Sequence, residues 1–378
     1  MKIVLAPDSF KESLSAADVC KAMQIGIERV SKDLQIESIP MADGGEGTVQ
    51  ALVASTDGEF IDEEVVGPLG GIIKAQYGIL GDGETAVIEM AEASGLQLVP
   101  LSARNPLKTT TYGTGQLMLS ALEKGCRKII MGIGGSATTD CGAGMAQALG
   151  TMFYNDEGSE IKTHMTGELM RQVASIDLKG RDGRLKQAEI TVACDVDNPL
   201  LGPRGAVMIY SPQKGATPDQ LEILENYMIH FIEIAEKTIS REIRGIPGTG
   251  AAGGLGAGLI AFADARLRPG VKLVMEACNF SDRIRNASLI LSGEGRVDVQ
   301  TAYGKTISGV TRAAKKQDIP VVVLGGSIGE GVENLYELGV NSLFSICSGP
   351  MSLEEAKQQA FELIADSSER IFRLFTIM

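Results

Sequence analysis

The feature that most constrains this chain is a repeated order of short apolar runs, glycine-rich or acidic loops, and helical patterns. The opening run KIVLA ends at Pro7 and Asp8, and apolar residues then recur at about every 3.6 residues from Val19 to Val30. The same order returns in the last third, where SLILSGEG, IPVVVLGGSIG and NSLFSI alternate with helical patterns. Such alternation predicts a parallel, doubly wound α/β sheet, in which ligands bind at the carboxyl ends of the strands.

The middle of the chain follows a different pattern. Between about Phe60 and Glu89, short alternating segments bounded by glycine (EEVVGP, AQYGIL and TAVIEM) predict an antiparallel meander. At 378 residues the chain has the length of about two domains. We therefore predict two α/β domains: a Rossmann-like domain with a parallel doubly wound sheet, formed by residues 1–56 and 286–378, and an inserted mixed α/β domain of residues 57–285.

Several helix starts carry capping residues three positions apart. These pairs are Ser15 with Asp18, Thr217 with Gln220, and Ser352 with Glu355. Side chains at this spacing can bond the backbone N–H groups that a helix leaves free in its first turn. In the helix after Thr217, apolar residues from Leu221 to Ala235 share one face, which predicts packing against a core.

The charge balance limits the partners. The chain has 35 Lys and Arg against 48 Asp and Glu, so its net charge of −13 repels polyanions, and we expect no nucleic-acid partner. No apolar run approaches the roughly 20 residues that span a bilayer, so we expect no membrane partner and no export signal. The six cysteines stand singly, which fits a reducing cytoplasm. The oligomeric state stays open.

One serine motif suggests a hydrolase, but the histidines decide against it. Residues 325–329, GGSIG, match the pattern GxSxG after a predicted strand, which would make Ser327 a nucleophile. That fold supplies its catalytic histidine after the serine, whereas the only histidines here are His164 and His230. A tight turn whose backbone amides face an anion is therefore the better interpretation.

Acidic residues gather in the glycine-rich loops. They are Asp8, Asp43, Glu46, Asp140, Asp195, Asp197, Glu294 and Asp298. Any one of them could cap a turn, but together they offer hard oxygen ligands that suit Mg²⁺, which takes one or two carboxylates plus substrate phosphates. With the loop lysines Lys11 and Lys305, they form a set suited to phosphoryl transfer.

Two glycine-rich loops compete for the phosphates of a nucleotide. One contains Gly134, Gly135 and Ser136 and follows the apolar run RKIIM; the other covers residues 250–256. Backbone amides in either loop could hold phosphate oxygens. Gly132, Gly134 and Ala137 also sit where a dinucleotide fingerprint would, so an NAD-dependent oxidoreductase stays an alternative, as does a ligand sensor without turnover.

Long segments, in order over nearly the whole chain, resemble the bacterial type I glycerate kinase family. They are APDSFKESLSA, PMADGGEGT, YGILGDGETAVIEMAEASGL, NPLKTTTYGTGQL, GIGGSATTDCGAGMAQALG, VACDVDNPLLGPRGA, SPQKGATP, GTGAAGGLGAG, SGEGRVDVQTAYGK and VVVLGGSIG. The resemblance implies ATP-dependent phosphorylation of D-glycerate, dependence on Mg²⁺, and two α/β domains with the active site in the cleft between them. Whether the 2- or the 3-hydroxyl receives the phosphate stays open.

With this activity in view, we assign the candidate residues to roles. Asp195 and Asp43 compete as the base, Asp195 or Asp197 holds Mg²⁺, and Lys11 neutralises the transferring phosphoryl group or the glycerate carboxylate. The expected glycerate site consists of Asp8, Ser9, Lys11, Gly44, Gly45 and Glu46. The expected nucleotide site consists of Gly134, Gly135, Ser136, Gly250, Gly253, Gly254, Gly256, Gly293 and Glu294.

Overall fold

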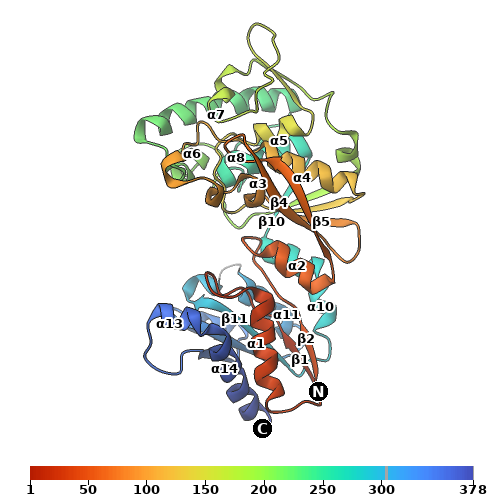
Figure 1. Cartoon of the computed structure of the whole chain (residues 1–378), viewed down its shortest axis with the longest axis vertical. Coiled ribbons are helices and arrows are strands. Elements are labelled where there is room, and N and C mark those ends of the chain that lie inside the picture. Colours follow the sequence, from red (N-terminus) through yellow and green to blue (C-terminus); the bar gives the residue numbers. More distant parts are fainter. Residues whose placement is uncertain (303–304, 378) are drawn as a thin grey trace. The chain divides into compact units, whose positions relative to one another are not determined.

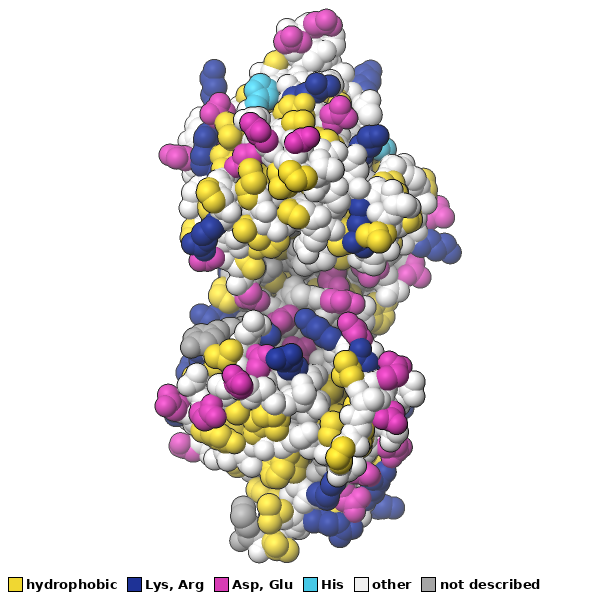
Figure 2. Space-filling view, turned by 90° about the vertical axis from the view of Figure 1, so that its left-hand side faces the viewer, with side chains coloured by type: hydrophobic (Ala, Val, Ile, Leu, Met, Phe, Trp, Pro, Cys, Tyr) yellow, Lys and Arg dark blue, Asp and Glu magenta, His cyan; other side chains and the backbone are white. Residues whose placement is uncertain are grey.

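The computed structural model describes residues 1–302 and 305–377, which divide into two compact units. Unit 1 contains residues 1–43, 47–58 and 269–378, so both ends of the chain lie in it (red and blue in Figure 1). Unit 2 contains residues 44–46 and 59–268. Acidic and basic side chains are interspersed over the face of each unit shown in Figure 2.

Unit 1 is built on a parallel sheet of five strands in the order β13-β12-β11-β1-β2. The strands are β1 (Lys2–Leu5), β2 (Gln35–Ser38), β11 (Leu289–Val297), β12 (Val321–Ile328) and β13 (Ser342–Ser345). Strand β1 lies between β2 and β11, with Ile3 opposite Leu289 and Ile36. The parallel sheet expected from the alternating pattern is thus confirmed, and β1 comes from the opposite end of the sequence to its neighbour β11.

Helices cover this sheet. They are α1 (Ala16–Glu28), α2 (Thr48–Thr56), α9 (Gly270–Ala277), α10 (Phe280–Arg283), α11 (Thr306–Lys315), α12 (Glu333–Leu338), α13 (Leu353–Gln358) and α14 (Ala360–Phe375). The expected caps at Ser15 and Ser352 are both present, the second as a full capping box. Helices α1 and α14 pack so closely that a Cβ atom on Gly26 would lie 2.0 Å from the Ala365 carbonyl oxygen. Their apolar faces share one core with β1 and β11.

Unit 2 has a mixed sheet of six strands in the order β10-β9-β6-β5-β4-β3. The strands are β3 (Glu59–Val66), β4 (Ile72–Ile79), β5 (Thr85–Glu89), β6 (Lys128–Gly132), β9 (Glu189–Ala193) and β10 (Arg266–Arg268), with β7 (Met152–Tyr154) and β8 (Ser175–Asp177) as a separate pair. Strands β3, β4 and β5 are antiparallel neighbours, as the meander pattern predicted, and β5, β6, β9 and β10 run parallel.

The helices of unit 2 are α3 (Ala91–Ser94), α4 (Tyr112–Glu123), α5 (Ala143–Ala148), α6 (Ala206–Tyr210), α7 (Pro218–Ile239) and α8 (Ala251–Ala263). Helix α7 begins with the expected capping box of Thr217 and Gln220, and it buries Leu224, Met228 and Phe231 in a core. Short 3-10 helices lie in both units, at Leu96–Leu98, Leu101–Ala103, Leu169–Gln172, Gly183–Gln187, Pro212–Lys214 and Val299–Ala302. Among the described residues, no helix combines the length and apolarity needed to cross a bilayer.

The boundaries between the units differ from those expected. The inserted segment was expected to end at residue 285, but unit 2 ends at Arg268. Strand β10 ties residues 266–268 to unit 2 because it pairs with β9, Leu267 opposite Val192. Helix α9 instead contacts α2 and α11 of unit 1, so residues 269–285 belong there. These contacts join residues far apart in sequence, and local patterns do not contain them.

Candidate active site

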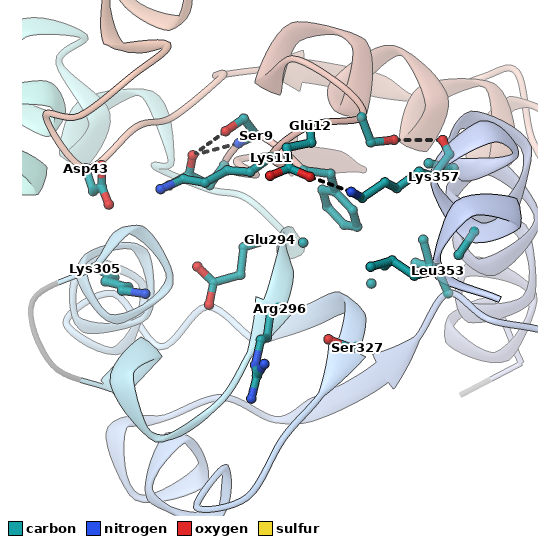
Figure 3. A pocket seen from close by; sticks show the side chains of 18 residues that line it. Ser9, Lys11, Glu12, Asp43, Glu294, Arg296, Lys305, Ser327, Leu353 and Lys357 are labelled. Atoms are coloured by element: carbon teal, nitrogen blue, oxygen red, sulfur yellow. Dashed lines mark hydrogen bonds and ion pairs between the residues drawn. The ribbon is translucent and has the colours of Figure 1, made fainter. Parts of the chain in front are cut away.

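A pocket of about 520 Å³ opens in unit 1 at the carboxyl ends of β1, β11 and β12 (Figure 3). The loop after β1 supplies Asp8 to Ser13, the loop after β2 supplies Asp43, and the end of β11 supplies Glu294 to Arg296. Lys305, Ser327, Ile346 and residues of α13 complete the wall. The position follows from topology, because neighbouring parallel strands bring their following loops to one edge of a sheet.

Asp8 is a buried acid of the pocket. Its side chain accepts hydrogen bonds from the Ser9 amide at 2.6 Å and from the Thr306 hydroxyl. Burial, and next the nearby charge of Asp43, raise its pKa to about 6, although the hydrogen bonds and Lys11 act in the opposite direction. Ionising this carboxyl group therefore costs free energy unless a cation comes near.

Glu294, on β11, is buried beside the same cavity. Its carboxylate accepts a hydrogen bond from the Thr301 hydroxyl, and Lys305 lies on the cavity side of it in Figure 3. Burial raises the pKa of Glu294 to about 7, with smaller contributions from the charges of Asp8 and Asp43. A carboxyl group with this pKa can exchange a proton with a substrate near neutral pH.

Cations face the acids at the same end of the pocket. Lys11 is exposed and extends toward Asp43 in Figure 3, and Lys305 directly precedes the first residue of α11. Arg296 instead points away from Glu294 and pairs with Asp298, with Nε 3.0 Å from the carboxylate oxygen. Three carboxylates and two lysines thus share one end of the cavity, a combination that can bind a negatively charged substrate and move a proton from it.

The opposite end of the pocket, called the apolar end below, is marked by Leu353 and by the ion pair of Lys357 with Glu12. The apolar side chains of the lining are Phe10, Ile346, Leu353, Ala356 and Ala360. In Figure 3, Leu353 and Lys357 lie on the side away from Asp43 and Lys305.

In unit 2, Gly134 and Gly135 lie exposed in the loop after β6, and Ser136 is buried. Below this loop, the fully buried Asp140 accepts hydrogen bonds from the amide and hydroxyl of Thr111 and from the amides of Gly142 and Gly144. Burial raises the pKa of Asp140.

Sequence reasoning missed Lys214, which is buried beneath the same loop. Its Nζ donates to the Thr138 carbonyl oxygen at 2.6 Å. Burial lowers the pKa of Lys214 to about 7, and Asp140 opposes that shift. Lys214 lies in the matching segment SPQKGATP, but no periodicity there separates it from a surface lysine, since its burial depends on how the short helix at residues 212–214 packs.

The second glycine-rich segment forms helix α8. A Cβ atom at Gly253 would lie 2.0 Å from the Thr138 carbonyl oxygen, and one at Gly250 would lie 2.2 Å from that of Pro199. A Cβ atom at Gly254 would lie 3.0 Å from the Cα atom of Cys141, and one at Gly256 would lie 2.5 Å from the Gly248 carbonyl oxygen. Close packing of backbone on backbone therefore accounts for these four glycines.

The remaining expected residues are scattered. Strand β9 ends at Ala193, so Asp195 and Asp197 lie beyond it on exposed chain, and Asp197 pairs with Arg204 at 2.8 Å. Gly44, Gly45 and Glu46 belong to unit 2 and do not line the pocket. Gly293 lies within β11, where its carbonyl accepts from the Asp8 amide at 2.8 Å.

The structure therefore gathers Asp8, Ser9, Lys11, Asp43 and Glu294 in one pocket of unit 1. Sequence reasoning gave no site role to Thr301, Thr306, Lys357 and Leu353, which lie in helical segments. Tyr303 and Gly304, part of the matched segment SGEGRVDVQTAYGK, lie outside the described residues.

Comparison with known proteins gives a consistent result. The model of the glycerate kinase family matches residues 3–376. A glycerate kinase of Halalkalibacterium halodurans is 50% identical over 98% of this chain and 97% of its own, and a glycerate 2-kinase of Escherichia coli K12 is 46% identical over 98% and 97%. The crystal structure of a protein described as glycerate kinase 2 from Salmonella typhimurium LT2 superposes with a TM-score of 0.91 at 42% identity, covering 100% of this chain and 98% of that one.

Proposed function

The chain belongs to the glycerate kinase family and is a phosphotransferase with an alcohol acceptor, and we propose that the pocket of unit 1 is where it phosphorylates D-glycerate from ATP. The observation that supports this location is the juxtaposition of Asp8, Asp43 and Glu294 with Lys11 and Lys305. Within the family we place the chain in the bacterial type I group on its matching motifs. Membership of a kinase family leaves the oxidoreductase and ligand-sensor hypotheses without support.

In our mechanism, Glu294 takes the proton from the attacking hydroxyl of glycerate. Its raised pKa of about 7 matches the requirement that a general base be ionised yet basic at neutral pH. Asp43 and, in unit 2, Asp195 are the competing candidates for this role. Thr301 holds one side of the Glu294 carboxylate by its hydrogen bond, which leaves the other oxygen for the substrate.

The remaining groups of the charged end orient the substrates. We assign glycerate to Asp8, Ser9 and Lys11, since a small hydroxy acid offers one carboxylate for the ammonium group and hydroxyls for the polar side chains. Lys305 and Lys11 would offset the negative charge of the transferring phosphoryl group.

The donor chemistry of the pocket fits Mg²⁺. Its carboxylates are hard oxygen ligands, and a bound cation would favour the ionised form of Asp8, whose pKa is raised first by burial and next by the charge of Asp43. Among the described residues, no group of three or more His, Cys, Asp or Glu could hold a metal by itself, whereas Mg²⁺ needs only one or two carboxylates beside substrate phosphates. We assign it to Asp8 and Asp43, with Asp195 and Asp197 as the alternative pair; the bound ion would reduce the charge repulsion at the phosphates.

For the ATP phosphates, the exposed loop at Gly134, Gly135 and Ser136 in unit 2 is the competing site. We favour the pocket of unit 1 because its lysines and carboxylates lie together there. The product we propose is 2-phosphoglycerate, since the relative from Escherichia coli is a glycerate 2-kinase. The six free cysteines support a cytoplasmic setting.

The direct test is turnover. With D-glycerate, ATP and Mg²⁺ the protein should release ADP, EDTA should abolish the reaction, and phosphorus NMR should identify 2-phosphoglycerate. Unchanged turnover in EDTA would contradict the magnesium assignment, and a 3-phosphoglycerate signal would contradict the position of transfer.

A further inference from the structure

The two ends of the pocket of unit 1 differ in chemistry, since the apolar end adds apolar side chains to a single ion pair of Lys357 with Glu12. Asp43, Lys305 and Glu294 mark the charged end in Figure 3, and Leu353 marks the apolar end across the cavity. The volume of about 520 Å³ lies within the range of sites that bind drug-sized molecules.

The apolar end is held in shape by its own contacts. One wall is the loop after β1, where the Phe10 ring is 3% exposed; the other wall is α13. Ser13 Oγ donates to the Lys357 carbonyl oxygen at 2.9 Å, and the Lys357 ammonium group pairs with Glu12. These bonds join the two walls, so the space between them is largely preformed.

Leu353 is the least covered part of this wall. Its side chain is 72% exposed, although it is large and apolar and stands at the rim of a cavity. A flat apolar ligand in the cavity would remove part of that surface from water, which stabilises the complex in proportion to the area covered.

The apolar end has no counterpart on glycerate, an acid of three carbons that carries polar groups along its whole length. The phosphoryl donor, in contrast, has charged phosphates at one end and an aromatic base at the other. Resting on the proposed function, we propose that the apolar end binds the nucleobase of the donor between Phe10 and α13, with the phosphates directed toward Lys11 and Lys305.

The test compares ADP with inorganic pyrophosphate, since only ADP carries the base. Calorimetric titration of the full-length protein would be repeated with Ala356→Phe, which fills the apolar end, and with Leu353→Ala, which removes apolar contact area without touching a buried core. We expect the Kd for ADP to rise by at least about tenfold in Ala356→Phe and about fivefold in Leu353→Ala, and the Kd for pyrophosphate to stay within about twofold.

Matched controls come from the same chain. Gln358→Phe adds a ring of the same size to the exposed side of α13, outside the pocket lining. Leu101→Ala removes a leucine that is 79% exposed in unit 2. Both controls should bind ADP like the unaltered protein, and thermal melts would establish that all four variants are folded.

Three results would overturn the proposal: unchanged ADP affinity in both pocket variants, equal weakening of ADP and pyrophosphate, or loss of ADP binding in Gly134→Val while the pocket variants bind normally. The last result would place the nucleotide on unit 2. A failure of the proposed function would give a different set of results. If the protein does not phosphorylate glycerate but the pocket variants selectively lose ADP affinity, the base subsite stands and only the acceptor is wrong.

Discussion

The most consequential single residues are the buried carboxylates of unit 1. Because Glu294 must be ionised to accept a proton and its pKa is raised to about 7, we expect kcat/KM for glycerate to fall as pH drops below about 7. The charge of Asp43 contributes to that shift, so Asp43→Asn should move the acid limb to lower pH. A pH–rate profile between pH 5.5 and 9 measures both effects, and a flat profile at the acid end would contradict the role of Glu294.

Replacing Glu294 separates catalysis from stability. Glu294→Gln should lower kcat by at least about a hundredfold, the lower range for a lost acid–base group. The folded protein holds the proton of Glu294 more tightly than the unfolded chain does. The stabilisation from this protonated carboxyl group is therefore fully present below the ordinary pKa of 4.5 and is lost as pH rises through about 7. At pH 8 the variant should therefore melt at a higher temperature than the unaltered protein.

Asp43→Asn and Asp195→Asn belong in the same series. If Asp195→Asn abolishes turnover while Glu294→Gln keeps a near-normal kcat, the base lies in unit 2 and our assignment is wrong. An unchanged melting temperature of Glu294→Gln at pH 8 would contradict only the predicted effect of this carboxyl group on stability.

Part of this site was predictable residue by residue. Asp8, Ser9, Lys11 and Asp43 follow strands that the sequence pattern reveals, and Glu294 lies in the carboxyl-terminal half of another. Such positions collect at one edge of a parallel sheet. Thr306 and Leu353 were not predictable, because their role depends on where helices pack. The glycines at 250–256 were expected to bind phosphate, and the structure adds tight backbone packing as a second reason for glycine there; the two reasons look the same in sequence.

Among the secondary-structure elements, α1 and α14 meet in a contact that leaves no room for a side chain at Gly26. Gly26→Ala would place a Cβ atom 2.0 Å from the Ala365 carbonyl oxygen, so the two helices must separate. We expect a loss of about 1–3 kcal/mol in the free energy of unfolding of unit 1, the usual cost of overpacking. Urea unfolding followed by circular dichroism would measure it.

Gly245→Ala is the matched control, since a Cβ atom there would meet no atom within 4 Å. Equal stability of the two variants would show that α1 and α14 can move apart without cost.

The loop after β6 contacts a buried lysine, Lys214, which donates to the Thr138 carbonyl oxygen. Lys214 has its pKa lowered to about 7 from an ordinary value of 10.5, so between these pH values the unfolded chain binds the extra proton. Stability of unit 2 should therefore rise with pH over that range, and Lys214→Met should remove this rise. Unfolding in urea at pH 7.0 and 9.5 tests it, with the exposed Lys186→Met as control. An equal pH dependence in both variants would contradict the burial of the charge.

Elements with local signals were predicted best. The starts of α1, α7 and α13 follow from capping residues three positions apart, which act within one turn. The expected end of the inserted segment at residue 285 was wrong because β10 pairs with β9 and α9 packs on α2, contacts that bridge long stretches of sequence.

At the scale of the whole molecule, the chain carries separate cores. Among the described residues, one core holds β1, β11, α1 and α14 of unit 1, and two more lie in unit 2. Proteins with independent cores commonly unfold in more than one step, so stability changes must be assigned to a unit before they are interpreted. Nucleotide bound to the pocket of unit 1 should raise the stability of that unit by mass action.

The pairing of β1 with β11 also has a consequence for how the protein is made. Residues 1–58 leave the ribosome first and contain only β1 and β2 of this sheet, while the strand on the other side of β1 begins at Leu289. One edge of β1 must therefore wait unpaired while the whole of unit 2 is synthesised, and two strands alone are marginally stable in water. We expect a chain that ends at Arg268 to protect its amides in β4, β5 and β6 from hydrogen exchange and to leave those of β1 and α1 unprotected. Strong protection of β1 in that shortened chain would show that β1 and β2 form a stable pair without β11. Until its last third emerges, the nascent protein thus exposes an apolar strand that a chaperone would recognise.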